Sequence, residues 1–193
     1  MLRDVWVATK MMIVTIVILG LLYPLLILGI AQAAFPAGAN GSIIDVGGRA
    51  AGSVLIAQGF SSAKYFQPRP SAAGAGWEAS ASAGSNLGPT SKTLFASVQG
   101  RVASATAENP GLTTGTVPVD MVTASGSGLD PDISVANALA QAPRVAKARR
   151  LTEDAVRALV TQRTQGPALG FLGEPRVNVL AINLALDGLE GSR

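Results

Sequence analysis

The chain has 193 residues, which is enough for about one ordinary domain and a short appendage. Its residues are 48% hydrophobic but only 14% charged, below the roughly 25% of soluble domains, which indicates a segment that does not meet water. Cysteine and histidine are absent and the formal net charge is +3. Disulfides, thiolate nucleophiles, the usual zinc clusters and a histidine base are therefore excluded, and a nucleic-acid surface is not indicated.

The first feature along the chain is a long apolar run within residues 1–34. No charged residue occurs between Lys10 and Asp45, and Met11 to Ile30 is almost wholly apolar. About twenty helical residues span roughly 30 Å, the thickness of the hydrocarbon core of a bilayer. The sequence therefore predicts a transmembrane helix with its core at residues 11–30.

The flanks of this run bear on its fate and its orientation. Ala31-Gln32-Ala33 has the small-x-small form of a signal-peptidase site, but the run exceeds the roughly 7 to 15 apolar residues of a signal peptide, which favours retention. Arg3 and Lys10 precede the helix. The positive-inside bias therefore predicts a cytoplasmic N-terminus and an extracytoplasmic domain over residues 35–193.

The stretch after the helix is expected to begin irregularly. Residues 35–52 are rich in glycine and alanine, which predicts a tether leaving the membrane. Ser53 to Ala57 is a short apolar run flanked by glycines and predicts a buried strand. Prolines keep Lys64 to Ala72 extended, and the small, polar stretch Ala73 to Pro89 predicts a long loop.

A helix and a strand are expected next. From Leu94 to Ala105 apolar residues recur every three or four positions, until Asn109-Pro110-Gly111 stops them, which predicts an amphipathic helix. Pro118 to Ala124 predicts a strand, followed by a flexible turn at Ser125 to Gly128.

Three further elements are expected in the last third of the chain. Asp130 as N-cap and Pro131 at the first helical position predict a helix that Pro143 ends or restarts. Thr152 starts another helix. Val177 to Leu186 is apolar at most positions and predicts a buried strand that passes into a short helical turn.

The expected fold class is α/β, with one N-terminal transmembrane helix followed by a single mixed α/β extracytoplasmic domain. The domain would hold about four helices and about three or four short strands. Strands that alternate with helices allow a parallel sheet, but the elements are too few to fix the topology. The expected boundaries are 1–34 for the anchor segment and 35–193 for the soluble domain.

Local motifs for nucleotide binding or catalysis are not found. The sequence has no P-loop and no G-x-G-x-x-G after a strand, and residues 125–128 lack the G-x-S-x-G spacing of a nucleophile elbow. A Ser-Lys hydrolase formed by Ser71 or Ser85 with Lys92 stays formally open, although such pairs arise by chance among many serines.

Charged residues raise three more hypotheses. Asp120, Asp130 and Asp132 offer oxygen ligands for a hard cation, although capping, helix-dipole and strand roles account for them better. The basic stretch Arg144 to Arg150 is able to meet anionic lipid or an acidic partner, but a solvated helix face is the stronger interpretation. Glu174-Pro175-Arg176 is either a salt-bridged turn or a partner contact.

Several ordered blocks of this sequence resemble one protein family. They include Tyr65 to Ala72 (YFQPRPSA), Gly84 to Thr90 (GSNLGPT) and, as the strongest, Val117 to Ser134 (VPVDMVTASGSGLDPDIS). Leu172 to Leu180 (LGEPRVNVL) and Asn183 to Asp187 (NLALD) complete them. With these blocks and the N-terminal span, the chain resembles the C subunit of the high-affinity potassium-transporting P-type ATPase, the KdpC family, over nearly its whole length.

The resemblance implies a non-catalytic accessory subunit that aids assembly in the bacterial inner membrane. Its implied partners are a channel-like potassium-binding subunit and a P-type ATP-hydrolysing subunit, besides membrane lipid. It also implies that the subunit raises the ATP affinity of the ATP-hydrolysing partner, so ATP belongs to the partner and no cofactor is expected to bind this chain directly. The candidate structural or partner motif comprises Gly84, Ser85, Asn86, Ser125, Gly126, Gly128, Asp130, Glu174, Pro175, Arg176 and Asn178.

Two positions depart from the family pattern, and two other classes of protein stay open. Asp132 stands where the family commonly has histidine, and Ala83 stands where a glycine usually precedes the Gly-Ser-Asn triplet. A single-span envelope enzyme would need a catalytic dyad, which is not evident, whereas an anchored binding module is harder to exclude. Because the charge bias places the domain away from cytoplasmic ATP, any effect on ATP affinity is expected to pass through subunit packing.

Overall fold

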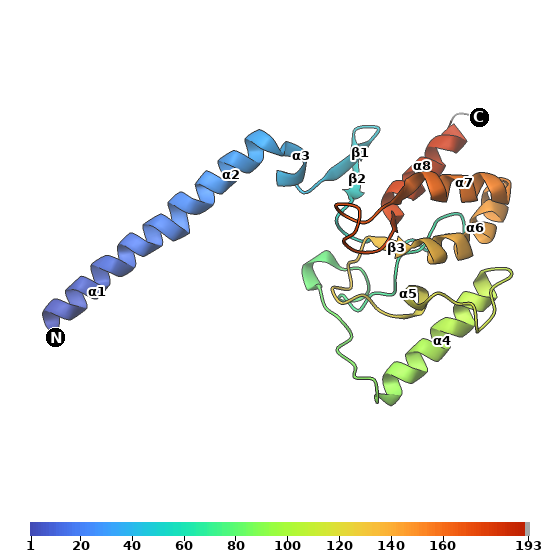
Figure 1. Ribbon diagram of the computed structural model, residues 1–193, viewed down its shortest axis with the longest axis horizontal. Coiled ribbons are helices and arrows are strands. Elements are labelled where there is room, and N and C mark those ends of the chain that lie inside the picture. Colours follow the sequence, from blue (N-terminus) through green and yellow to red (C-terminus); the bar gives the residue numbers. More distant parts are fainter. Residues whose placement is uncertain (192–193) are drawn as a thin grey trace. The chain divides into compact units, whose positions relative to one another are not determined.

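The structure is a computed structural model that describes residues 1–191 (Figure 1). The chain forms two compact units, Met1–Ala51 and a second that begins at Gly52. The first unit contains the apolar helix and most of a small hairpin, and the second contains the remaining helices and strands.

An unbroken helical segment forms the beginning of the chain. It comprises α1 (Leu2–Thr15), a π-helical part η1 (Ile16–Leu22) and α2 (Tyr23–Ala34). The segment Leu2–Ala34 has 33 residues and a mean hydropathy of 2.7 in its most apolar window, of which 0% is buried. It is therefore long and apolar enough to cross a membrane, as the sequence predicts.

The expected irregular tether is wrong in part. Residues 35–52 form a short helix α3 (Pro36–Ala39) and a hairpin of β1 (Ile43–Val46) with β2 (Arg49–Ser53). Between the strands Gly47 and Gly48 have φ values of 60° and 77°, the left-handed pair that a tight hairpin turn requires. The glycines that suggested a linker therefore belong to a turn.

The strand expected at Ser53–Ala57 is also wrong, because β2 ends at Ser53 and the chain leaves the hairpin there. The apolar run is instead held by tertiary contacts, since the Ala57 amide donates to the Leu129 carbonyl at 3.0 Å. The following loop is as expected: residues 66–89 contain only one short 3-10 turn, η2 (Ala79–Ala81), in the described structure.

The amphipathic helix is confirmed as α4 (Lys92–Glu108), capped by the Ser91 hydroxyl, which accepts from the Leu94 amide at 3.3 Å. Its apolar stripe is poorly covered, since Ala105 is the buried side chain on it and Phe95 is 73% exposed. The strand expected at Pro118 to Ala124 is wrong, because one helical turn, α5 (Val119–Val122), forms there. A short apolar run fits either state, and tertiary contacts decided it.

The three-stranded sheet has the order β3-β5-β4, from β3 (Asp132–Ser134), β4 (Thr164–Gln165) and β5 (Arg176–Asn178). Both pairs are antiparallel, so the parallel sheet that the element order allowed is not formed in the described structure. In the register, Ile133 and Thr164 each lie opposite Val177 of the central strand. The central strand thereby links two segments distant in sequence.

The predicted start and end of the next helix are both wrong. It is α6 (Val135–Arg149), and its N-cap is Ser134, whose hydroxyl accepts from the Asn137 amide at 3.0 Å. Asp130 does not cap a helix, because its carboxylate accepts from the Asp132 amide at 3.1 Å and the chain forms β3 before α6 begins. Pro143 lies inside α6 and does not end it.

Two more helices complete the domain. The predicted start at Thr152 is confirmed for α7 (Glu153–Arg163), where the threonine hydroxyl accepts from the Ala155 amide at 3.3 Å. The strand expected at Val177–Leu186 is mostly wrong, because α8 (Val179–Gly191) follows β5 directly. Asn178 caps it by accepting from the Ala181 amide at 3.0 Å.

The core lies where α6, α7 and α8 meet the sheet, which Figure 1 shows at the C-terminal end of the chain. On α8 the buried positions 179, 182 and 186 follow helical spacing. One side chain from outside these elements, Phe66, is fully buried among them. The cluster includes Phe66, Ile133, Val145, Val156, Val160, Val177, Val179, Ile182 and Leu186.

Candidate functional site

The segment around Phe66 crosses the core without a partner strand, and side-chain amides bind its backbone instead. The Phe66 amide donates to Asn183 Oδ1 at 2.8 Å, and Asn183 Nδ2 donates back to the Phe66 carbonyl at 2.9 Å. Gln67 makes the same two bonds with Gln141, at 2.8 and 3.0 Å. Each carboxamide therefore replaces one residue of a neighbouring strand, which satisfies backbone groups that would be costly to bury alone.

Arg144, which like Gln141 belongs to α6, also binds the same segment, and it is only 7% exposed. Its Nη1 donates to the carbonyls of Ala63 and Tyr65 at 2.7 and 3.1 Å. Its Nε donates to Asn109 Oδ1 at 3.0 Å, and its Nη2 donates to Gln141 Oε1 at 2.6 Å. These bonds offset the desolvation of the guanidinium group.

Arg149, one helical turn further, holds the beginning of the segment. Its Nε donates to the Lys64 carbonyl at 2.7 Å, and its Nη2 pairs with Asp187 of α8 at 2.8 Å. The guanidinium group also lies 4.9 Å from the centre of the Tyr65 ring, whose hydroxyl donates to Asp187 at 3.2 Å. Together these contacts tie the segment to both α6 and α8.

The interpretation of Arg144–Arg150 as a solvated helix face is therefore wrong for two of its members. Arg144 and Arg149 point inward and are buried, whereas Lys147 and Arg150 are exposed. Both arginines point inward because the main-chain carbonyls of Ala63, Lys64 and Tyr65 have no neighbouring strand to supply donors. The basic stretch therefore contributes two arginines that hold the backbone of residues 63–67. We call these bonds, with those from Gln141 and Asn183, the backbone clamp.

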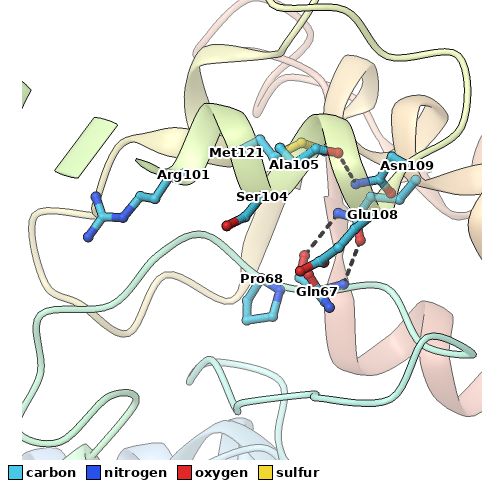
Figure 2. A pocket seen from close by; sticks show the side chains of 9 residues that line it. Gln67, Pro68, Arg101, Ser104, Ala105, Glu108, Asn109 and Met121 are labelled. Carbon is cyan, nitrogen blue, oxygen red and sulfur yellow. Dashed lines mark hydrogen bonds between the residues drawn. The ribbon is translucent and has the colours of Figure 1, made fainter. Parts of the chain in front are cut away.

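A cavity of about 130 Å³ lies between this segment and α4 (Figure 2). In the figure Ser104 and Glu108 of α4 face Gln67 and Pro68, while Arg101 points away from them. Arg144 bonds to two of the lining residues, Asn109 and Gln141; burial lowers its pKa, and the charge of Glu108 opposes that shift. The lining residues are Gln67, Pro68, Arg101, Ser104, Ala105, Glu108, Asn109, Met121 and Gln141.

A second cavity, of about 450 Å³, adjoins the first and shares Gln67, Pro68, Arg101 and Met121 with it. Its other walls are mainly apolar and include Trp77. We call the two cavities together the α4 groove. A polar end beside Glu108 and an apolar end beside Trp77 suit a partner's polypeptide better than a small polar substrate.

Trp77 and Arg101 are the distinctive side chains of the apolar end. Trp77 has a φ of 52°, and its backbone amide donates to Ser71 Oγ at 2.8 Å. Its indole nitrogen donates to the Arg69 carbonyl at 3.2 Å, so the ring is held in one orientation. Arg101 donates to the Val122 carbonyl at 3.1 Å, and no carboxylate among residues 1–189 pairs with it.

The structure brings together two loops that contain predicted site residues. A Cβ atom on Gly84 would lie 2.7 Å from the Gly126 carbonyl oxygen. Gly128 has a φ of 69°, and a Cβ there would lie 2.6 Å from the Ala83 carbonyl oxygen. The glycines therefore allow close backbone contact between these loops, and nothing about them forms a phosphate cradle with an adjacent lysine.

The remaining residues of those two loops have differing roles. Ser85 and Asn86 are exposed, and Asn86 has a φ of 51°. Ser125 is 3% exposed, and its amide donates to the Pro70 carbonyl at 3.2 Å. Asp130 pairs with Arg69 at 2.9 Å, which fixes the end of the turn to the clamped segment.

The carboxylates of the three aspartates proposed for a cation are each engaged by different side-chain partners. Asp120 accepts from the Ser134 amide and hydroxyl at 2.8 and 2.9 Å and from Asn137 Nδ2 at 3.0 Å. Asp132 pairs with Arg176 at 3.0 Å, and Asp130 pairs with Arg69. The described residues contain no group of three acidic side chains placed to hold a metal.

Among the other predicted positions, Arg176 and Asn178 make structural contacts, whereas Glu174 and Pro175 are exposed. Arg176 of Glu174-Pro175-Arg176 pairs with Asp132, so its partner lies across the sheet and outside that turn. Asn178, besides capping α8, donates to the Val54 carbonyl at 2.9 Å. The Ser71 hydroxyl donates to the Gly128 carbonyl at 2.6 Å, and no bond joins it to Lys92 in the described structure.

Sequence reasoning missed Gln141 and Asn183, the amides that hold the segment, and Asn109, which accepts from Arg144. A usable signal exists for Asn183, which is the one polar residue in the apolar run Val179–Leu186 and is 1% exposed. An isolated amide on a buried helical face needs a buried partner. Its partner lies 117 residues away, which no local pattern reveals.

Comparisons with known proteins agree with one another. The family model described as K+-transporting ATPase, c chain (KdpC) matches residues 5–188. A potassium-transporting ATPase KdpC subunit of Caulobacter vibrioides (strain NA1000 / CB15N) is 59% identical over 172 residues, which cover 89% of this chain and 86% of that protein. The proteins of the same name from Rhodospirillum rubrum and Mycobacterium tuberculosis (strain ATCC 25177 / H37Ra) are 54% and 51% identical, covering 97% and 98% of this chain and 96% and 100% of theirs.

Proposed function

The chain belongs to the KdpC family of K+-transporting ATPase c chains, and we propose that within such a complex it is a non-catalytic accessory subunit that aids assembly. The observation that carries the proposal is the use of its polar side chains. Arg144, Gln141 and Asn183 all bind the domain's own backbone, and the Ser71 hydroxyl does the same. Such residues build a rigid scaffold, and none of these side chains is a nucleophile paired with a base in the described part of the chain.

We propose the two partners that the family implies, a channel-like potassium-binding subunit and a P-type ATP-hydrolysing subunit. A protein contact is supported by exposed apolar side chains on the two helices that contribute to the walls of the α4 groove, since Phe95 of α4 and Val119 of α5 are both 73% exposed. Contiguous patches of exposed large apolar side chains mark surfaces that other proteins cover. Arg101 at the apolar end favours a partner segment that carries a carboxylate there.

We also propose an orientation in the bacterial inner membrane. Arg3 and Lys10 at the start of the apolar helix favour a cytoplasmic N-terminus, which leaves the second unit outside the cytoplasm. An influence on ATP affinity would then reach the ATP-hydrolysing subunit through packing between subunits. The sequence contains no P-loop, the motif that would instead indicate direct ATP binding by this chain.

Co-purification from detergent extracts tests the accessory role. An affinity tag on this chain should recover both partner subunits in a constant ratio from cells that express the complex. Phe95→Ser should reduce that recovery, whereas Leu55→Ser, at a 60% exposed position away from α4, should not. Recovery of the tagged chain alone, or equal recovery for both variants and wild type, would contradict the role or the contact surface respectively.

A further inference from the structure

The helix from Leu2 to Ala34 has an internal change of hydrogen bonding. Between Ile16 and Leu22 it is π-helical, and the Tyr23 amide at the end of this part donates to the Ile18 carbonyl, five residues back. In a regular α-helix the same amide would donate to the Leu19 carbonyl. Short π-helical parts inside α-helices are frequent at functional sites.

The next residue removes the remaining donor. The Leu19 carbonyl has its α-helical donor in Tyr23, which is engaged with Ile18, and its π-helical donor would be residue 24. Residue 24 is proline, which has no amide hydrogen. The Leu19 carbonyl is therefore left without a main-chain donor by the chain's own helix.

The surface at this point is open. The affected carbonyl belongs to the peptide bond between Leu19 and Gly20, and glycine has no side chain to cover it. A Cβ on Gly20 would meet only Ile16 Cγ2, at 3.8 Å. Another helix can therefore approach the peptide group closely.

The membrane makes this acceptor expensive to leave unpaired. The position lies in the middle of the most apolar part of the chain, where lipid tails offer no donors. An unsatisfied carbonyl in hydrocarbon is costly, so a donor from outside the chain stabilises the arrangement.

We infer that the Leu19–Gly20 peptide group is an acceptor site for a membrane-spanning helix of a partner subunit that carries a hydroxyl, amide or similar donor at the same depth. The inference rests on the proposed function, since it names one contact through which the accessory subunit joins its complex. The occupant is a helix, because only a helix brings a donor to this depth without exposing its own backbone to lipid.

Carbonyl carbon chemical shifts provide a direct test in bilayers. Leu19 and Leu28 are both followed by glycine, so labelling leucine at the carbonyl carbon and glycine at nitrogen reports both peptide bonds, together with those after Leu87, Leu169 and Leu172. The variants Gly20→Leu and Gly29→Leu each remove one signal and thereby assign the two signals of the apolar helix. On assembly with the partner subunits, the Leu19 signal should move downfield, as expected for a new hydrogen bond, and the Leu28 signal should stay. An unchanged Leu19 signal in the complex overturns the inference.

Variants give an independent test by co-purification of the full chain. Pro24→Ala restores an amide that can donate within the helix, and Gly20→Leu covers the peptide group, so each should lower recovery of the partner subunits about fivefold. Gly29→Leu is the matched control, because a Cβ on Gly29 would meet nothing within 4 Å, and recovery should stay at the wild-type level.

The outcomes separate this inference from the proposed function. If wild type recovers the partners and Pro24→Ala and Gly20→Leu do so equally well, the acceptor site is wrong and the accessory role stands. If Gly29→Leu is as harmful as they are, the contact is not specific to this peptide group. If cross-linking at Gly20 captures a second copy of the chain instead of a partner subunit, the assigned occupant is wrong.

Discussion

At the scale of single residues, Asn183 shows how a carboxamide can serve as a piece of β-sheet. It offers one acceptor and one donor in the same spacing as a backbone residue, and both are used by Phe66. The side chain is 1% exposed, so water cannot replace either bond. The contribution of Asn183 to folding stability is therefore set mainly by the free energy lost when the Phe66 amide and carbonyl have no partners.

Asn183→Asp is expected to make folding stability strongly dependent on pH. Burial raises the pKa of the introduced carboxyl, and in its neutral form that group can still accept from the Phe66 amide and donate to the Phe66 carbonyl. Stability relative to wild type is then nearly retained in acid and is lost as pH rises through the raised pKa, by about 3 kcal/mol. Urea unfolding of the full chain in detergent at several pH values measures it.

The control for this prediction is Asn86→Asp, which makes the same chemical change at an exposed position. Its stability relative to wild type should stay nearly constant over the same pH range. A loss that is equal at all pH values for Asn183→Asp would show that the neutral carboxyl does not replace the amide.

At the scale of elements, the turn that contains Gly126 and Gly128 combines two different demands on the backbone. Gly128 needs both a positive φ and room beside Ala83, whereas a Cβ on Gly126 would have no atom within 4 Å. Position 128 therefore requires glycine because of its positive φ and its close contact with Ala83. Position 126 contributes its backbone carbonyl, which lies close to Gly84.

Gly128→Ala is expected to destabilise the domain by about 2 kcal/mol or more, because it adds a strained φ to a clash with backbone atoms. Gly126→Ala, two residues earlier in the same turn, should change stability by less than about 0.5 kcal/mol. Thermal unfolding of the full chain in detergent compares the two. Similar losses for both variants would mean that the turn is sensitive to any side chain.

The elements also show where sequence patterns succeed and where they fail. The helices at Lys92–Glu108 and Glu153–Arg163 were predictable because a hydroxyl cap precedes a helical apolar pattern. The helix at Val135–Arg149 was misplaced because Asp130 and Ser134 are both good caps, and the pairing of β3 with β5 selects the second. Val119–Val122 was mistaken for a strand because four residues carry too little periodicity.

The candidate site was predictable only in part, for a related reason. Its blocks were visible in the sequence, but the pairing of Arg144 with carbonyls 79 to 81 residues away depends on the assembled fold. Local patterns favour exposure for such a cation, and only the unpaired backbone of the 63–67 segment explains why it is buried.

At the scale of the whole molecule, we expect ATP to bind the ATP-hydrolysing partner subunit and not this chain, which a binding measurement can test. Isothermal titration of ATP and magnesium into the full chain in detergent should show no saturable binding at millimolar nucleotide, because no lysine-bearing glycine loop cradles phosphate. Titration into the assembled complex should show binding. Saturable binding to the chain alone, combined with protection of residues 52–191 from external protease in spheroplasts, would favour a direct nucleotide role and reverse the orientation.

The backbone clamp on residues 63–67 has a consequence for the order of events during biosynthesis. Its bonds join residues 74 to 117 positions apart, so Asn183 leaves the ribosome long after Phe66. While the nascent chain is being synthesised, the Phe66 backbone lacks the side chain of Asn183, and the early half of the domain cannot complete its hydrogen bonds. Folding must therefore wait for the C-terminal helix, and until then the chain is a substrate for chaperones and proteases.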